Sequence, residues 1–454
     1  MADENEAVAT VDPLTDAATE ENEAATTVDP LADAATDEDN LYEDGYVKGT
    51  ADYIKECATP MTIAVQGNWG VGKTSLFNLI TKEFQVKAES KEGDNPDEEK
   101  YCEGIIGVEA IDIGQRAASN PDENLFDTIF VAVLSKIAGH DLKTVENVSG
   151  IASVATQIIS EYAVEDESEG EENAEDGSFL GGILNALFSA EEEKKSESED
   201  NAVSDEDIEA FKNAITDALR QSAEEDGKTE DSRFVVFIDG LDHIEPKAAV
   251  DIMEKMKTFL ECSRCVFVYA IDETAVYDGV RAKFGDKVDE GRRKMFFEKH
   301  VQVPLSIPTS SYDLDKYFKH LLKDEKERSG EFAEVANALL IAPTPRTIKR
   351  YVNTMYENLS AFEESGNVGS ASLAMLFAAV ILKVDSSKGF DAVANCAEGD
   401  MAHFAENLKA VLESLGHDDG INWEMLPTLW RSKDGIYVDA LKRGDFLSWI
   451  RKLK

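Results

Sequence analysis

The chain has 454 residues, of which 43% are hydrophobic, enough for two or three domains with full apolar cores. Its formal net charge is -47, so electrostatic repulsion makes direct binding to nucleic acid unexpected. The sequence contains neither a recognisable signal peptide nor an apolar run of the roughly 18–20 residues that span a membrane. We therefore expect a cytoplasmic protein without an integral membrane segment.

Residues 1–40 form an acidic segment that contains a 17-residue repeat, in which Glu4–Glu20 recurs as Glu21–Asp37. Neither copy contains Lys, Arg or an aromatic residue, so the segment cannot bury enough apolar surface to offset its conformational entropy. We expect a disordered tail. The alternative is a short motif that folds on a partner, with Val11–Leu14 and Val28–Leu31 as its repeated anchors.

Met61–Ile80 is typical of a buried strand, a tight glycine loop and an apolar helix. The loop fits the pattern G-x-x-x-x-G-K-[ST], in which glycines let several backbone N–H groups point at one phosphate group. The N-terminus of the following helix adds favourable positive charge. The predicted nucleotide-binding residues are Gly67, Asn68, Trp69, Gly70, Val71, Gly72, Lys73, Thr74 and Ser75.

Further apolar strands alternate with helical segments along the rest of the predicted core, residues 41–310. Such alternation predicts an α/β fold, a P-loop NTPase core with a parallel sheet and helices on both faces. The expected strands are 104–111, 234–239, 265–271 and 301–305, and the expected helices are 124–138, 208–219 and 248–260.

Residues 139–205 interrupt the predicted core with two strongly acidic runs on either side of a brief apolar patch, Phe179–Phe188. We expect a partly disordered insertion. The patch is too short to span a bilayer, and its acidic flanks favour docking on the parent domain or a partner over an anionic membrane surface.

Residues 311–454 show only helical periodicity, which predicts an α-helical C-terminal domain. The expected helices include 312–322, 332–340, 345–359 and 371–382.

A phosphate loop needs a metal ligand on a neighbouring strand, and Asp239 ends the apolar run FVVFI at the carboxyl edge of the sheet. Thr74 and Asp239 are the predicted Mg²⁺ ligands. Hydrolysis also needs a group that orients water, usually directly after the metal-binding Asp. That position is Gly240, so Asp242 becomes the candidate; the alternative is that Asp242 caps a turn and turnover is slow or absent.

Two further side chains are candidates for sensing the terminal phosphate. Asp272 ends the strand 265–271 and so lies at the same edge as Asp239. Arg346 stands with Lys349 and Arg350 at the start of a predicted helix, where cations oppose the helix dipole. A nucleotide bound between the two domains would compensate this charge, and an ordinary salt-bridged helix is the competing interpretation. No Asn-Lys-x-Asp element typical of guanine recognition is present, so ATP is the expected nucleotide.

Taken together, several segments resemble the KAP family of P-loop NTPases. They are GNWGVGKTS around Trp69, the acidic string Asp239–His243, the element with Glu298, Lys299, Gln302, Pro304 and Pro308, and the helix with Pro345, Arg346, Ile348, Lys349, Arg350 and Asn353. The resemblance covers about residues 45–360. It implies a Mg-ATP-dependent switch, a STAND-type ATPase that works with protein partners, possible self-association into a homo-oligomer, and a soluble form without the family's membrane helices. Bacterial defence is the context it suggests by analogy.

The chain departs from the family pattern at two positions of the acidic string. Gly240 replaces the second acid and His243 replaces an arginine. The alternative function is therefore a catalytically weak ATP-binding scaffold or interaction protein. If the missing acid limits turnover, Gly240→Asp is expected to raise the rate of hydrolysis.

Overall fold

The computed structural model describes residues 31, 34–36, 38–43, 45–85, 100–119, 125–139, 205–285, 289–322, 326–363, 372–385, 390 and 421–422. The predicted repeat up to residue 30, nearly all of the predicted insertion and most of the last 70 residues therefore lie outside the described residues.

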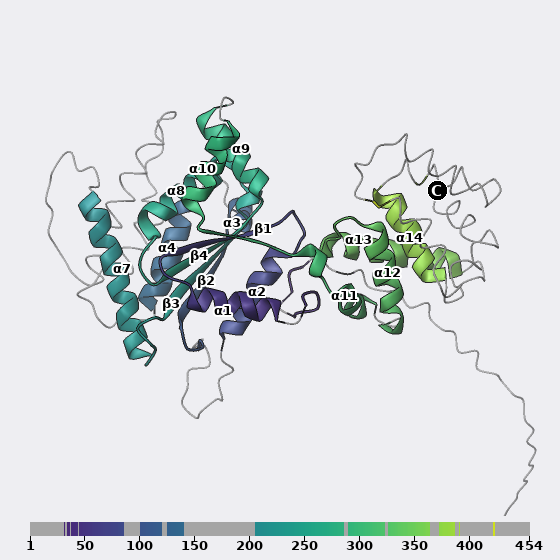
Figure 1. Cartoon of the computed structure of the whole chain (residues 1–454), viewed down its shortest axis with the longest axis horizontal. Coiled ribbons are helices and arrows are strands. Elements are labelled where there is room, and N and C mark those ends of the chain that lie inside the picture. The colour runs from purple at the N-terminus through teal and green to yellow at the C-terminus, as the bar shows by residue number, and fades with distance from the viewer. Residues whose placement is uncertain are drawn as a thin grey trace, which may run out of the picture.

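A five-stranded parallel sheet forms the centre of the α/β core (Figure 1), with the strand order β2-β3-β4-β1-β5. The strands are β1 (Met61–Gln66), β2 (Ile105–Asp112), β3 (Arg233–Asp239), β4 (Cys265–Ile271) and β5 (Val303–Ser306). β4 pairs in parallel with both β1 and β3, so it separates the strand before the phosphate loop from the strand that ends in Asp239. All parallel strands end at one edge, which places their following residues together.

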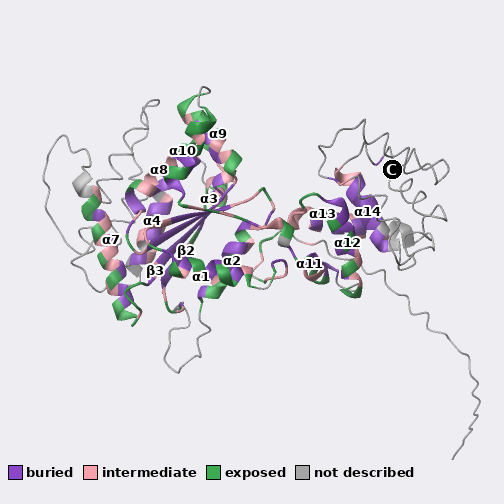
Figure 2. Cartoon of the chain, in the orientation of Figure 1, coloured by how far each residue is buried: buried purple, intermediate pink, exposed green. Residues whose placement is uncertain are grey.

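Both faces of the sheet are covered by helices, which explains why the central strands β1, β3 and β4 are apolar runs without alternation. In β3, Val235 and Phe237 pack into one core while Phe234, Val236 and Ile238 pack into the other. The buried strands lie between the two helical layers in Figure 2. One face carries α1 (Tyr46–Glu56) and α2 (Lys73–Phe84); the other carries α4 (Leu125–Gly139), α7 (Asp205–Glu225), α8 (Pro246–Leu260), α9 (Glu273–Phe284) and α10 (Glu290–His300).

A helical region follows β5 and packs around aromatic side chains. The ring of Phe377 lies 5.4 Å from Phe318 and 5.2 Å from Phe332, centroid to centroid. Its helices are α11 (Leu314–Leu321), α12 (Ser329–Leu339), α13 (Pro345–Glu363) and α14 (Ser372–Asp385). The fold class predicted from the sequence, a P-loop core followed by a helical region, is confirmed.

Short elements complete the described chain and join the core to the site. They are α3 (Ile113–Ser119), which follows β2 directly, and the 3₁₀ turns η2 (Leu241–His243), η3 (Thr309–Ser311) and η4 (Lys326–Arg328). Across the residues that the structure describes, every helix is too short or too polar to traverse a lipid bilayer.

Candidate nucleotide-binding site

The phosphate loop connects the end of β1 to the start of α2, and two of its glycines have backbone angles that other residues rarely adopt. Gly70 has a φ of +80° and Gly72 a φ of +97°, both in the left-handed region. Gly72 is also the N-cap of α2, so the first N–H groups of that helix face the loop. Free N–H groups at a helix N-terminus attract phosphate, as the motif predicts.

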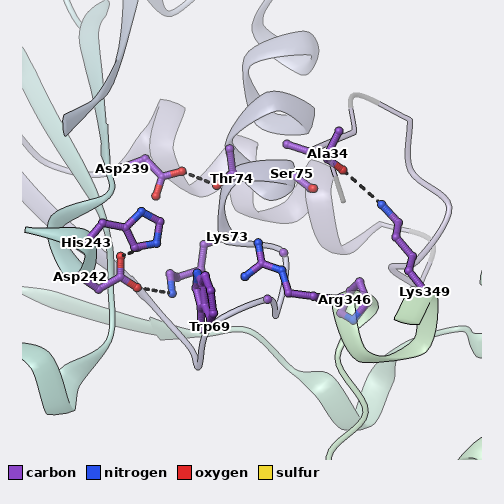
Figure 3. A pocket seen from close by; sticks show the side chains of 14 residues that line it. Ala34, Trp69, Lys73, Thr74, Ser75, Asp239, Asp242, His243, Arg346 and Lys349 are labelled. Carbon is purple, nitrogen blue, oxygen red and sulfur yellow. Dashed lines mark hydrogen bonds and ion pairs between the residues drawn. The ribbon is translucent and has the colours of Figure 1, made fainter. Parts of the chain in front are cut away.

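Lys73 is held at the base of the loop by two acceptors. Its Nζ donates to the carbonyl oxygen of Gly67 at 2.9 Å and to Oδ2 of Asp242 at 3.0 Å. The side chains of Lys73 and Asp242 are only 7% and 9% exposed. Burial makes each charge depend on the other, so η2, which carries Asp242, is bound to the phosphate loop (Figure 3).

Thr74 and Asp239 meet directly across the site. The Thr74 hydroxyl donates to Oδ2 of Asp239, and the backbone N–H of Gly240 donates to Oδ1 at 2.8 Å. Burial raises the pKa of Asp239; these two hydrogen bonds oppose the rise, and the carboxylates of Asp112 and Asp242 add to it. A hydroxyl and a carboxylate in contact are oxygen donors of the kind that Mg²⁺ takes, so the residues present fit a bound magnesium ion.

Gly240 has no room for a side chain. Its φ is +80°, and a Cβ placed there would lie 2.4 Å from the backbone nitrogen of Gly114 and 2.9 Å from Oδ1 of Asp112. The expectation that Gly240→Asp raises hydrolysis stays a prediction, and on this backbone a side chain at position 240 would first have to displace Gly114 at the start of α3. Glycine at position 240 thus replaces the acid of the family pattern and also fits the close packing against Gly114 and Asp112.

Arg346 brings the helical region to the phosphate loop. Its guanidinium carbon lies 4.3 Å from the ring centroid of Trp69, and its backbone N–H donates to the carbonyl oxygen of Gly70 at 3.5 Å. Trp69 is 67% exposed and points its ring edge-on toward His243, 6.2 Å away. The hydroxyl of Tyr312 adds a buried bond to the Val71 carbonyl at 2.7 Å. The start of α13 and the phosphate loop therefore pack together and form one side of the candidate site.

The described residues before α1 cross the site through their backbones. The Thr36 N–H donates to Oγ of Ser75 at 3.2 Å, and the Ala34 carbonyl accepts from Nζ of Lys349 at 3.2 Å. The side chain of Asn353 brackets Leu31, accepting from its N–H at 2.7 Å and donating to its carbonyl at 3.0 Å. The predicted tail thus includes residues that contact the loop and α13.

A cavity of about 120 Å³ lies between these elements (Figure 3). It is lined by Ala34, Ala35, Trp69, Gly70, Gly72, Lys73, Thr74, Ser75, Asp239, Asp242, His243, Pro345, Arg346 and Lys349. Asp272 is not one of the lining residues; its Oδ1 accepts from the Thr274 N–H at 2.9 Å and caps α9. Most of the predicted site residues are therefore brought together, and Asp272 stands apart with a capping contact.

The KAP family P-loop domain matches residues 43–358 of the chain. The chain belongs to the KAP family of P-loop domains. This membership makes it a nucleotide-binding P-loop protein. Among solved structures, a chain of the Aeropyrum pernix Orc1 protein in complex with DNA aligns at 11% identity and a TM-score of 0.33, over 90% of this chain and 99% of that one. No curated protein matches.

Two residues near the predicted magnesium ligands, Asp112 and His243, were not predicted to be site residues, although His243 was noted as a departure from the family pattern. Asp112 ends β2 and is in register with Asp239 of β3, and His243 lies 3.7 Å from Oδ1 of Asp242 through its Nε2. An acidic residue at the end of an apolar strand was the available signal for Asp112. No signal marked Ala34 and Ala35, because residue 34 contacts the site through its main chain.

Proposed function

We propose that this KAP-family chain binds Mg-ATP between the α/β core and α13, hydrolyses it slowly, and works as a molecular switch. The observation that carries the proposal is the convergence of Lys73, the Thr74–Asp239 pair and Arg346 on one cavity. Each of these groups suits a different part of a magnesium-bound triphosphate.

Different groups of the chain bind different parts of the Mg-ATP complex. The loop N–H groups and the start of α2 hold the phosphates, and Lys73 exchanges Asp242 for the outer phosphate oxygens. Thr74 and Asp239 hold magnesium, which when bound neutralises charge that develops on the phosphates. Arg346 supplies a further cation from the helical region, so the bound nucleotide and the position of α13 depend on each other.

Adenine is the proposed base. A second cavity of about 50 Å³ lies beside the first and is bounded by residues 36 and 38–42, Ser75, Leu79, Tyr317 and Pro345. Its place next to the phosphate loop supports a role as the base side of the site, and the missing Asn-Lys-x-Asp element argues against guanine. Competition of ATP and GTP against a fluorescent adenine nucleotide tests this choice; equal displacement by GTP would contradict it.

The experiment for the main proposal is identification of the nucleotide that co-purifies with the protein, followed by steady-state hydrolysis of ATP with magnesium. Lys73→Ala should abolish nucleotide binding, and Asp239→Ala should leave binding measurable and remove the magnesium dependence of turnover. Hydrolysis that persists unchanged in both variants would reject the proposal.

A catalytically weak ATP-binding scaffold is the second candidate, favoured by the lack of any side chain at Gly240. It predicts tight ATP binding with turnover no faster than the Lys73→Ala background. Both candidate functions require partners. We propose that these partners are proteins and that the chain acts in the cytoplasm. Analogy with the family suggests bacterial defence as the biological context. Partner capture compared between Mg-ATP and Mg-ADP, and mass measurement for a homo-oligomer, test this part.

A further inference from the structure

The site of this chain lacks the usual group for orienting the attacking water. A side chain at position 240 would force the Gly114 backbone to shift, and both oxygens of Asp242 face cationic or ionisable partners, Lys73 at 3.0 Å and His243 at 3.7 Å. If ATP is hydrolysed here, as proposed above, another carboxylate must take this role or turnover must rely on positioning alone.

Asp112 stands beside Asp239 at the edge of the sheet where the strands end. It is the last residue of β2, and its Cα pairs in register with Asp239 of β3. Asp112 is exposed, so its carboxylate is accessible to water. Its Oδ1 accepts the N–H of Gln115 at 2.9 Å, which fixes the side chain over the start of α3.

The space that Asp112 fills is the space that a side chain on residue 240 would need. A Cβ on Gly240 would lie 2.9 Å from Oδ1 of Asp112, and the Gly114 backbone closes the same volume at 2.4 Å. A side chain on residue 240 would therefore collide with the Gly114 backbone as well as with the Asp112 carboxylate.

We propose that Asp112 is the catalytic base that orients and deprotonates the attacking water. The inference rests on the proposed ATP hydrolysis. The water oxygen bonds to the γ-phosphorus while the bond from that phosphorus to the bridging oxygen breaks, and the bonding electron pair leaves with ADP. One water proton passes to the Asp112 carboxylate, which releases it to solvent through its exposed face.

Asp112 also caps α3, so the test separates charge from capping. Asn accepts the same N–H bond and caps a helix as well as Asp does; Asp112→Asn therefore removes only the ionised carboxylate. Its matched control is Asp289→Asn, because Asp289 caps α10 in the same manner, with Oδ1 accepting from the Arg292 N–H at 2.8 Å, and is not paired in register with Asp239 as Asp112 is.

The measurements are the dissociation constant for Mg-ATP by titration calorimetry, the single-turnover rate, and the thermal unfolding midpoint. Asp112→Asn should slow the single turnover by about 100-fold, as expected for loss of a general base. Its ATP affinity should change less than about 3-fold and its midpoint should match Asp289→Asn. Asp112→Glu, which keeps a carboxylate, should recover part of the rate.

Turnover of Asp112→Asn at the wild-type rate would overturn the assignment while leaving the proposed ATPase function intact. A wild-type protein that binds ATP without hydrolysing it would also overturn the assignment and would favour the scaffold. A wild-type protein with no affinity for ATP would instead reject the proposed function itself. Asp242→Asn, measured in parallel, shows whether the carboxylate in η2 is the base instead.

Discussion

The buried pair of Lys73 and Asp242 makes a quantitative prediction for Asp242→Asn. The two side chains are 7% and 9% exposed and lie 3.0 Å apart, so the substitution leaves a buried ammonium without its compensating charge. Breaking such a pair costs about 3–5 kcal/mol. The lower end, about 3 kcal/mol, applies because the Gly67 carbonyl still accepts from Lys73 at 2.9 Å. At about 2 °C per kcal/mol for a large domain, the unfolding midpoint should fall by about 6 °C.

Nucleotide should reverse part of this loss. If Lys73 binds the outer phosphates, ATP supplies the negative charge that the Asp242→Asn variant lacks, so Mg-ATP should raise the midpoint of the variant more than that of the wild type. Differential scanning fluorimetry with and without Mg-ATP measures both quantities. Asp217→Asn is the control, because its ion pair with Arg220 is 3.3 Å long and about half exposed and is worth at most about 1 kcal/mol.

Two outcomes would refute this reasoning separately. An unchanged midpoint in Asp242→Asn would mean that the pair contributes no net stability. A lowered midpoint that Mg-ATP does not restore would mean that Lys73 keeps its protein partner in the bound state and does not reach the phosphates.

Two further substitutions test the contacts around the loop. Gly70→Ala should lower ATP affinity, because its Cβ would lie 2.8 Å from a side chain carbon of α13; Gly45→Ala, at a φ of +91° with open space around it, carries only the backbone strain of about 1–2 kcal/mol. Equal losses of stability in the two glycine variants, with ATP affinity retained, would contradict the close approach of Gly70 to α13. Asn353→Ala should speed hydrogen exchange at the Leu31 amide roughly 5-fold, because that amide loses the Asn353 side chain as its acceptor. Asn358→Ala, whose Nδ2 donates to the Thr354 carbonyl within α13, should leave that exchange unchanged.

The strands β1, β3 and β4 were predictable because each is a nearly continuous apolar run, as burial on both faces demands. The helices α9 and α10 were not predicted. In α10 only Phe296, Phe297 and His300 are buried, and most of its other residues are charged. It forms beside α8 and α9, where Phe297 meets Tyr277 edge-on at 6.5 Å. Such a helix depends on tertiary contacts that a local pattern does not contain.

The candidate site was predictable where a local motif carries the chemistry, as in Lys73, Thr74 and Asp239. Asp112 was missed because its distance from Asp239 depends on the pairing of β2 with β3, which the strand pattern leaves open. The packing constraint at Gly240 was not predictable for the same reason, since the atoms that crowd a side chain there belong to Asp112 and Gly114. The missing information is strand order, which the sequence encodes only through long-range packing.

A continuous set of contacts joins the buried ion pair to the helical region. His243 lies 3.7 Å from Asp242, the Trp69 ring lies 6.2 Å from the His243 ring, and the Arg346 guanidinium lies 4.3 Å from Trp69 on the other side. A phosphate that draws Lys73 away from Asp242 changes the first of these contacts, and Arg346, at the last, lines the same cavity. If the nucleotide binds as proposed, both ends therefore respond to one ligand, which is the physical condition for a nucleotide to bias the position of α13.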